Sequence, residues 1–164
     1  MNPPLPPALP LALARSLAGV GTLMVAARDL WWIIASAAVA LHGADPGPVA
    51  DVDVLLSVRD ARHILPSIGV EPRPGTAHAQ FRSDIFATWT QMPLPVEFMA
   101  GFHHHADGRW NPVRPASRER VDSDGVSLFM PDRAELYDML LRFGRPKDME
   151  RARRLMRSGP PPPP

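Results

Sequence analysis

The chain has 164 residues, of which 45% are hydrophobic, so it can bury one core and has little room for a second. Its 18 lysines and arginines nearly balance its 17 aspartates and glutamates. This balance argues against nucleic-acid binding through overall charge, although a local basic patch remains compatible with it. Cysteine is absent, which excludes disulfides and cysteine-based zinc sites and is compatible with a reducing compartment.

The start of the chain does not match a targeting signal. Residues 1–14 are apolar and rich in proline, but no basic residue precedes them, and Arg15 follows the run. A secretory signal has the opposite order. The longest apolar run, Leu30–Leu41, is shorter than the roughly 20 residues of a membrane-spanning helix. We therefore predict a soluble, cytoplasmic protein without a membrane partner.

Proline marks both ends of the sequence. Residues 1–10 contain five prolines, and residues 160–164 are all proline. Such segments favour extended and poorly ordered conformations over core structure. We predict a proline-rich tail over residues 1–10, one domain over residues 11–158 and a polyproline tail over residues 159–164.

The first half of this domain is expected to alternate helices and strands. Aliphatic residues at helical spacing predict a helix over Leu11–Ala27. A buried strand, a short helix that stops near Gly43, a second strand and a helix ended by Pro66 are then predicted at Trp31–Ile34, Ser36–Leu41, Val52–Leu56 and Arg59–Leu65. The aliphatic and β-branched residues of the second strand suit the centre of a sheet.

The next segment is richer in strands. Alternating apolar residues predict antiparallel strands over Gln80–Trp89 and Pro95–Phe102. A hairpin is predicted over Arg118–Met130, with its turn at Asp122–Gly125.

A pair of helices is predicted at the C-terminal end of the domain. Asp132 is a suitable N-cap, and Glu135 three residues later gives a box-like start to a helix over Arg133–Phe143. Gly144 ends that helix. Pro146 then occupies the first turn of a basic helix that runs to about residue 157.

Three acids among apolar residues are the candidates for chemistry. Asp51 and Asp53 are two apart at the strand Val52–Leu56, so their side chains point to the same face. Glu97 lies in an apolar strand of its own. Carboxylates placed in this way repel each other and resist burial unless a cation lies between them. Their hard oxygen donors suit Mg²⁺ or Mn²⁺, whereas the alternative for an isolated D-x-D pair is two surface acids.

A turn of small residues precedes the acids. Residues 31–43 read WWIIASAAVALHG, which predicts a strand, a turn at Ala35-Ser36 and the start of a helix. Small residues allow backbone N–H groups to approach a triphosphate at a helix N-terminus. The Ser36 hydroxyl can add a contact to phosphate or simply cap the helix.

The order of these features resembles the minimal nucleotidyltransferases. A strand, a small-Ser turn, a helix ending in Leu-His-Gly, a loop and then Asp51-Val52-Asp53 are arranged as in antibiotic nucleotidyltransferases and the transferases of toxin–antitoxin pairs. Glu97 matches the family's third acid on a later strand. The segment FGRPKD at 143–148 resembles the helix opening of many small members. The Ala35-Ser36 turn departs from the family's usual Gly-Ser or Gly-Gly.

The resemblance implies an α+β fold: a mixed β-sheet flanked by helices, with the C-terminal helical pair. It also implies two metal ions and the transfer of a nucleoside monophosphate from an NTP to a hydroxyl acceptor, which can be a small molecule, RNA or protein. The alternative is a catalytically reduced nucleotide-binding or partner-binding module, such as a toxin–antitoxin component.

The same resemblance assigns roles to individual residues. It implies that the catalytic metal ligands are Asp51, Asp53 and Glu97, with Glu97 alternatively acting as the base that deprotonates the acceptor. The residues expected to contact the nucleotide are Ala35, Ser36 and Lys147. For Lys147 the alternative is a solvated position at the start of a helix, together with Arg145 and Asp148.

Three other groups of residues have predicted structural roles. His103, His104 and His105 alternate faces on a strand, so they do not converge on one ion, and we predict an exposed cluster. Trp31 and Trp32 are predicted to pack the sheet against the first helix. The last helix carries a basic group that we interpret as a solvated face or, alternatively, as a contact for an acidic partner or RNA: Arg151, Arg153, Arg154 and Arg157.

Overall fold

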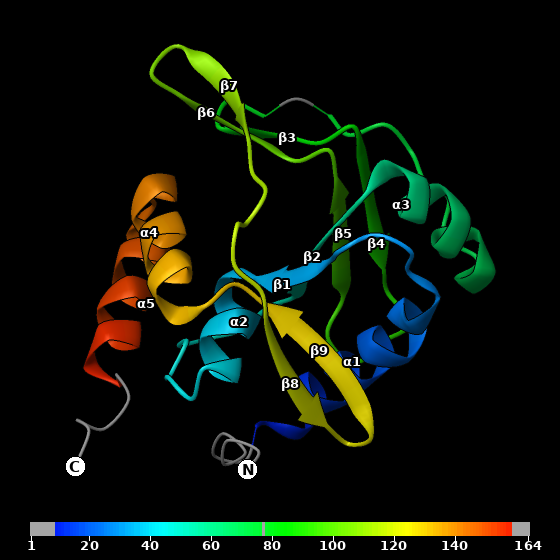
Figure 1. The fold of residues 1–164 in the computed structure, drawn as a ribbon, viewed down its shortest axis with the longest axis horizontal. Coiled ribbons are helices and arrows are strands. Elements are labelled where there is room, and N and C mark those ends of the chain that lie inside the picture. The colour runs from blue at the N-terminus through cyan, green and yellow to red at the C-terminus, as the bar shows by residue number, and fades with distance from the viewer. Residues whose placement is uncertain (1–8, 77, 159–164) are drawn as a thin grey trace.

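The computed structural model describes residues 9–76 and 78–158 (Figure 1). Except for residues 9 and 10, the predicted tails lie outside the described residues. The division into tails and one domain therefore stays a prediction.

The centre of the fold is a mixed four-stranded sheet with the order β1-β2-β5-β4 (Figure 1). Its strands are β1 (Trp32–Ile34), β2 (Val52–Leu56), β5 (Val96–Ala100) and β4 (Ile85–Trp89). The inner strands β2 and β5 are parallel, and both outer strands pair antiparallel to them. The predicted central position of Val52–Leu56 is confirmed, and so is the mixed sheet.

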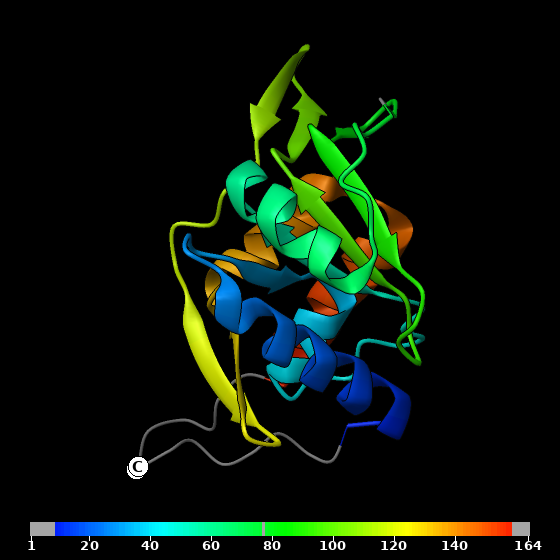
Figure 2. The same ribbon diagram turned by 90° about the vertical axis from the view of Figure 1, so that its right-hand side faces the viewer.

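Helices cover both sides of this sheet. They are α1 (Leu11–Leu23), α2 (Ala35–Leu41), α3 (Val58–Ile64), α4 (Arg133–Phe143) and α5 (Pro146–Arg157). Figures 1 and 2 show α1 and α3 on one side and the pair α4–α5 on the other. Short 3-10 turns follow α1 at Met24–Ala26 and α3 at Leu65–Ile68. Among the described residues, no helix combines the length and the apolar character needed to cross a membrane.

The helix ends follow local signals. Asp132 caps α4 by accepting the Glu135 N–H at 2.8 Å. The Glu135 carboxylate does not complete a capping box, because it accepts the backbone N–H groups of Ala116 and Ser117 instead. Gly144 ends α4 with φ 67°, a left-handed conformation that glycine adopts without strain.

The predicted strand Gln80–Trp89 is wrong as a single element. Phe81–Arg82 forms β3, which pairs with β6 (His103–Ala106), whereas β4 begins at Ile85 and pairs with β5. Gly101, with φ 62°, turns the chain out of β5 into β6. The pairing with β5 extends back to Asp84, whose N–H bonds the Ala100 carbonyl, and the residues before Asp84 pair with β6 instead. The sheet β3-β6-β7, completed by β7 (Arg109–Pro112), projects from the central sheet (Figure 1).

The predicted hairpin in the second half is confirmed. Strands β8 (Glu119–Ser123) and β9 (Val126–Met130) are joined at Asp124-Gly125, where φ is 49° and 80°. Two consecutive left-handed residues match the twist of a two-residue hairpin turn. The hairpin packs on α1, where a Cβ at Gly21 would lie 2.6 Å from Val126.

The two tryptophans face opposite sides of β1. Trp31 lies in the main core that includes α1, and its ring meets Phe129 edge-on with centroids 5.4 Å apart. Trp32 lies in a second cluster with Met139 and Phe143 of α4. The prediction that both pack against the first helix is therefore wrong for Trp32, because successive side chains of a strand alternate faces.

Candidate active site

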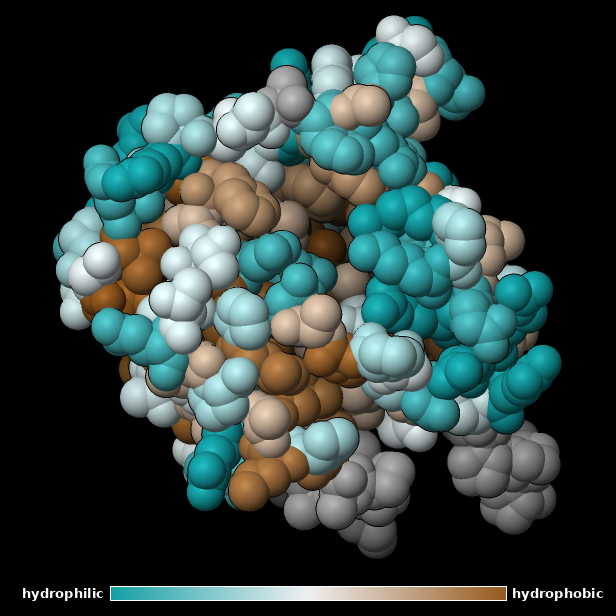
Figure 3. Space-filling model, turned by 180° about the vertical axis from the view of Figure 1, so that it is seen from behind, coloured by the Kyte–Doolittle hydropathy of each residue, from teal (hydrophilic) through white to brown (hydrophobic). Residues whose placement is uncertain are grey.

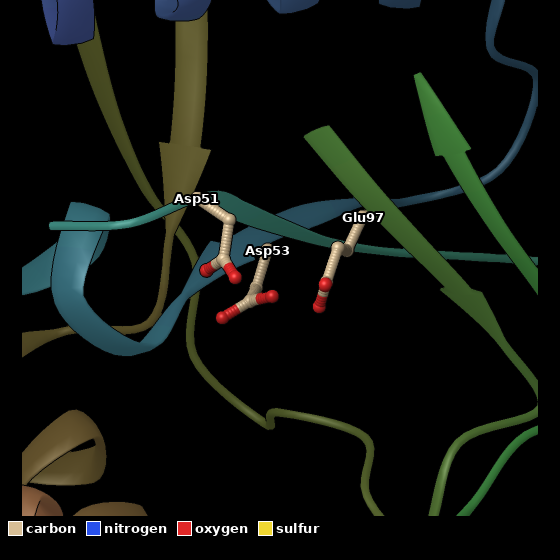
Figure 4. Close-up of side chains that lie close together, drawn as sticks. All are labelled: Asp51, Asp53 and Glu97. Carbon is tan, nitrogen blue, oxygen red and sulfur yellow. The ribbon is translucent and has the colours of Figure 1, made fainter. Parts of the chain in front are cut away.

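Strand register brings the three predicted acids together. Asp53 on β2 is the direct partner of Glu97 on the parallel strand β5, so both side chains point to the same face. Asp51, two residues earlier, points the same way (Figure 4). One carboxylate oxygen from each residue lies within 4.8 Å of the others, and all three residues are half-buried. We call these residues the acidic triad.

The surroundings of the acidic triad disfavour negative charge. Burial raises the pKa of Asp53 well above its usual value, and the charges of Asp51 and Glu97 raise it further. Burial, followed by the charge of Asp51, also raises the pKa of Glu97, partly offset by a hydrogen bond with Asp53 and then by the charge of Lys147. A divalent cation would offset this repulsion, and three carboxylates are the donor type that Mg²⁺ or Mn²⁺ prefers. The residues present therefore fit such a metal.

The acidic triad opens into a cavity of about 420 Å³. Figure 3 shows a hollow on the face behind that of Figure 1, with hydrophobic atoms deep inside and hydrophilic residues at its margin. The size is typical of small-ligand sites. Besides the triad, the lining includes the predicted turn, aromatic residues and basic residues: Ala35, Ser36, Phe81, Arg82, Phe86, Phe102, Phe143, Arg145, Lys147 and Arg151.

The turn Ala35-Ser36 keeps a glycine-like backbone. Ala35 has φ 58°, although alanine rarely adopts this left-handed conformation, while the preceding Ile34 is extended. Both turn residues are buried and begin α2. The surrounding structure therefore imposes the geometry that glycine would adopt freely.

At the start of α5, Arg145 is paired with a carboxylate, whereas Lys147 is not. Asp148 is fully buried and binds Arg145 through two contacts, Nε–Oδ2 at 2.6 Å and Nη2–Oδ1 at 3.1 Å. The Arg145 guanidinium also lies 5.0 Å from the centre of the Phe81 ring. Lys147 is exposed at the cavity and forms no salt bridge within the described part of the chain. The alternative of a solvated helix start is thus wrong for Asp148.

Solved structures similar to this chain include nucleotidyltransferases. TM1012 of Thermotoga maritima, provisionally assigned as a nucleotidyltransferase, is 21% identical with a TM-score of 0.67, over 88% of this chain and 92% of that one. The lincosamide antibiotic adenylyltransferase LnuA, solved with lincomycin bound, is 9% identical with a TM-score of 0.56, over 87% and 96%. ANT(2'')-Ia, solved with adenylyl-2''-tobramycin, is 13% identical with a TM-score of 0.53, over 87% and 88%.

The chain has the nucleotidyltransferase fold. No protein-family model matches the sequence, and no curated protein matches it. The resemblance of the motifs to the minimal nucleotidyltransferases is confirmed at the level of the fold. Sequence identities this low do not extend the resemblance to a shared activity.

Within the nucleotidyltransferase fold, sequence reasoning missed part of the cavity. Phe81 and Arg82 come from β3, Phe102 from the turn after β5 and Phe143 from the end of α4. They meet only through tertiary packing, so no local pattern identified them. Arg151 had a signal, because it lies four residues after Lys147 and therefore on the same face of α5.

The basic face of α5 is not simply solvated. Arg151 donates to the carbonyls of Pro46 and Pro48, each at 3.2 Å, and so ties α5 to the loop before Asp51. Arg154 pairs with Asp45 at 3.0 Å in the same loop. The prediction of a purely solvated face is wrong for these two arginines, because the loop supplies oxygen acceptors opposite them.

The three histidines do not form one exposed cluster. His104 is buried beside Phe81 and Phe143, with ring centroids 5.3 and 5.2 Å away, whereas His105 is exposed against Trp110. Burial lowers the pKa of His104. Within the described ranges, the acidic triad is the one set of three acids or histidines close enough to share a metal ion.

Proposed function

We propose that the protein is a metal-dependent nucleotidyltransferase that moves a nucleoside monophosphate from an NTP to a hydroxyl acceptor. The observation that carries this proposal is the acidic triad, with oxygens within 4.8 Å of one another, facing a cavity of a nucleotidyltransferase fold. A triad of like charges is unfavourable without a cation, so its assembly on two neighbouring strands supports a metal site.

In this proposal Asp51, Asp53 and Glu97 hold Mg²⁺ or Mn²⁺. When bound, the metal stabilises charge on the attacking and leaving oxygens. Lys147 lies on the cavity wall close enough to lower the pKa of Glu97, and it would pair with phosphate oxygens of the NTP. The turn Ala35-Ser36 would offer backbone N–H groups and the Ser36 hydroxyl to the triphosphate.

The reaction would be an in-line displacement. The acceptor hydroxyl oxygen forms a bond to the α-phosphorus, the bond to the bridging oxygen breaks, and pyrophosphate leaves. The hydroxyl proton must be accepted during the attack. Glu97 is suited to this role as an alternative to metal binding, because its carboxylate faces the cavity beside those of Asp51 and Asp53.

ATP is the first donor to test, because LnuA, solved with lincomycin, is an adenylyltransferase and ANT(2'')-Ia was solved with an adenylyl-tobramycin adduct. Those acceptors support a small molecule, with RNA or protein as the other classes. Because an NTP is the proposed donor, we expect the protein to act in the cytoplasm, where NTPs are made.

Calorimetry with Mg²⁺ and a non-hydrolysable ATP analogue tests the proposal. We expect wild type to bind, Asp53→Asn to lose binding at least tenfold, and Glu71→Gln to bind like wild type. Glu71 is a matched control, because its carboxylate is 70% exposed and lies outside the cavity. Equal binding by wild type and Asp53→Asn would contradict the assigned ligands, and no binding by wild type would contradict the function.

A further inference from the structure

The cavity holds no carboxylate beyond the acidic triad. Among the described residues that line it, only Asp51, Asp53 and Glu97 carry a carboxylate. If these three bind metal, none is left to pair with an ammonium group of an acceptor. A polycationic acceptor would therefore lose hydration at this site without gaining an ion pair to a protein carboxylate.

Three cations at the same cavity lack a carboxylate partner. Arg82, Lys147 and Arg151 line the cavity, and none of them forms a salt bridge within residues 9–76 and 78–158. Arg151 bonds only backbone carbonyls, and Arg82 stacks over Trp110 at 5.0 Å. Because Lys147 would pair with the NTP phosphates, the charges of Arg82 and Arg151 remain to act on an acceptor in the cavity.

The cavity also has an aromatic end, formed by residues of β3, the turn after β5 and the end of α4. Phe81 stacks on Phe102 with centroids 5.4 Å apart and meets Phe143 edge-on at 5.1 Å. Arg82 follows Phe81 on β3 and also lines the cavity, with its guanidinium over the Trp110 ring. Such a surface suits a ring with an apolar face and a neutral or negative substituent.

We propose that the acceptor of this enzyme is a neutral or anionic small molecule that carries an aromatic or other apolar ring, and that polycations are rejected. This inference rests on the proposed function and specifies its acceptor class. The apolar ring lies against Phe81 and Phe102, and Arg82 selects for the charge of the acceptor.

Binding of matched glycosides tests this selection. The probes are the β-glucuronide, β-glucoside and 2-amino-β-glucoside of 4-nitrophenol, which carry charges of −1, 0 and +1, and methyl β-glucoside, which lacks the aromatic ring. Each is titrated into protein saturated with Mg²⁺ and the ATP analogue, so that the nucleotide occupies its own part of the cavity. Affinity is measured by ligand-observed NMR or calorimetry.

We expect affinity to fall from glucuronide to glucoside to aminoglucoside, by about threefold to fivefold per unit charge, as for one partly exposed ion pair. Methyl glucoside should bind more weakly than the aryl glucoside. Arg82→Glu should reverse the order of the charged probes, whereas Arg62→Glu, an exposed arginine on α3 outside the cavity, should leave it unchanged. Added salt at 0.5 M should compress the differences.

Tightest binding of the aminoglucoside, equal binding of all charged probes, or no binding of any probe would each overturn the inference. Equal binding of the methyl and aryl glucosides would overturn the aromatic subsite and leave the surface to the nucleotide base. Failure of the acceptor inference can be distinguished from failure of the proposed function, because binding of the ATP analogue is measured first. The order of the probe affinities is then measured again with Mg²⁺ alone.

Discussion

Replacing Ala35 by glycine should relieve backbone strain without disturbing the cavity. Ala35 has φ 58°, and releasing that conformation gains roughly 1–2 kcal/mol. The freedom of glycine in the unfolded chain costs roughly 0.5–1 kcal/mol, and the lost burial of one methyl group costs about 0.8 kcal/mol. The terms nearly cancel, so Ala35→Gly should change the free energy of unfolding by less than about 1 kcal/mol.

Ala37→Gly is the matched control, because Ala37 is fully buried in the same helix and its φ is negative. It keeps both unfavourable terms and relieves no strain, so it should lower the free energy of unfolding by about 2 kcal/mol. Urea unfolding of the metal-free proteins, compared at equal m-values, measures both effects. Equal destabilisation by the two substitutions would refute a left-handed Ala35. Ala35→Gly should also bind the ATP analogue at least as tightly as wild type.

Three further predictions concern charge. Mg²⁺ at ten times its Kd should stabilise wild type by about 1.4 kcal/mol in thermal unfolding, and Asp53→Asn should remove this increment while leaving the metal-free protein equally or more stable. The raised pKa of Asp53 means that the folded metal-free protein holds this proton more tightly than the unfolded chain, whose value is near 3.8. The stability of metal-free wild type should therefore fall relative to that of Asp53→Asn as pH rises above 3.8 through the folded pKa. The Mg²⁺ increment should shrink at low pH, because the ligands must be deprotonated to bind metal. Urea unfolding at several pH values measures the first effect, and an equal pH dependence of the free energy of unfolding in the two proteins would contradict it. Arg145→Ala leaves the fully buried Asp148 carboxylate without its cation and should cost about 3–5 kcal/mol, whereas Arg73→Ala, in an exposed pair, should cost less than about 1 kcal/mol in the same assay.

Elements with strong local signals could be predicted from the sequence. The helix Arg133–Phe143 and the strand Val52–Leu56 have the predicted bounds, and the last helix begins at Pro146 as predicted. An N-cap, a helix-stopping glycine and a first-turn proline act on neighbouring residues, so no knowledge of packing is needed. The acidic triad was also accessible, because the spacing of Asp51 and Asp53 fixes a shared face.

Features that depend on distant contacts could not be predicted. The break between β3 and β4 follows from the exit of the chain at Gly101, because β3 pairs with β6 beyond that residue whereas β4 pairs with β5 before it. His104 is buried because Phe143, from a helix far along the chain, packs on it. The aromatic end of the cavity likewise exists only once β3 and α4 have met.

The most direct test of nucleotidyl transfer compares two labels on ATP. The protein is incubated with Mg²⁺, ATP labelled at the α- or γ-phosphate, and 4-nitrophenyl β-glucoside or β-glucuronide. We predict that the α-label alone enters the acceptor, that pyrophosphate is released in equal amount, and that Asp53→Asn abolishes both signals while Glu71→Gln retains them. Label entering from the γ-phosphate, or equal transfer by Asp53→Asn, would contradict metal-dependent nucleotidyl transfer at the acidic triad.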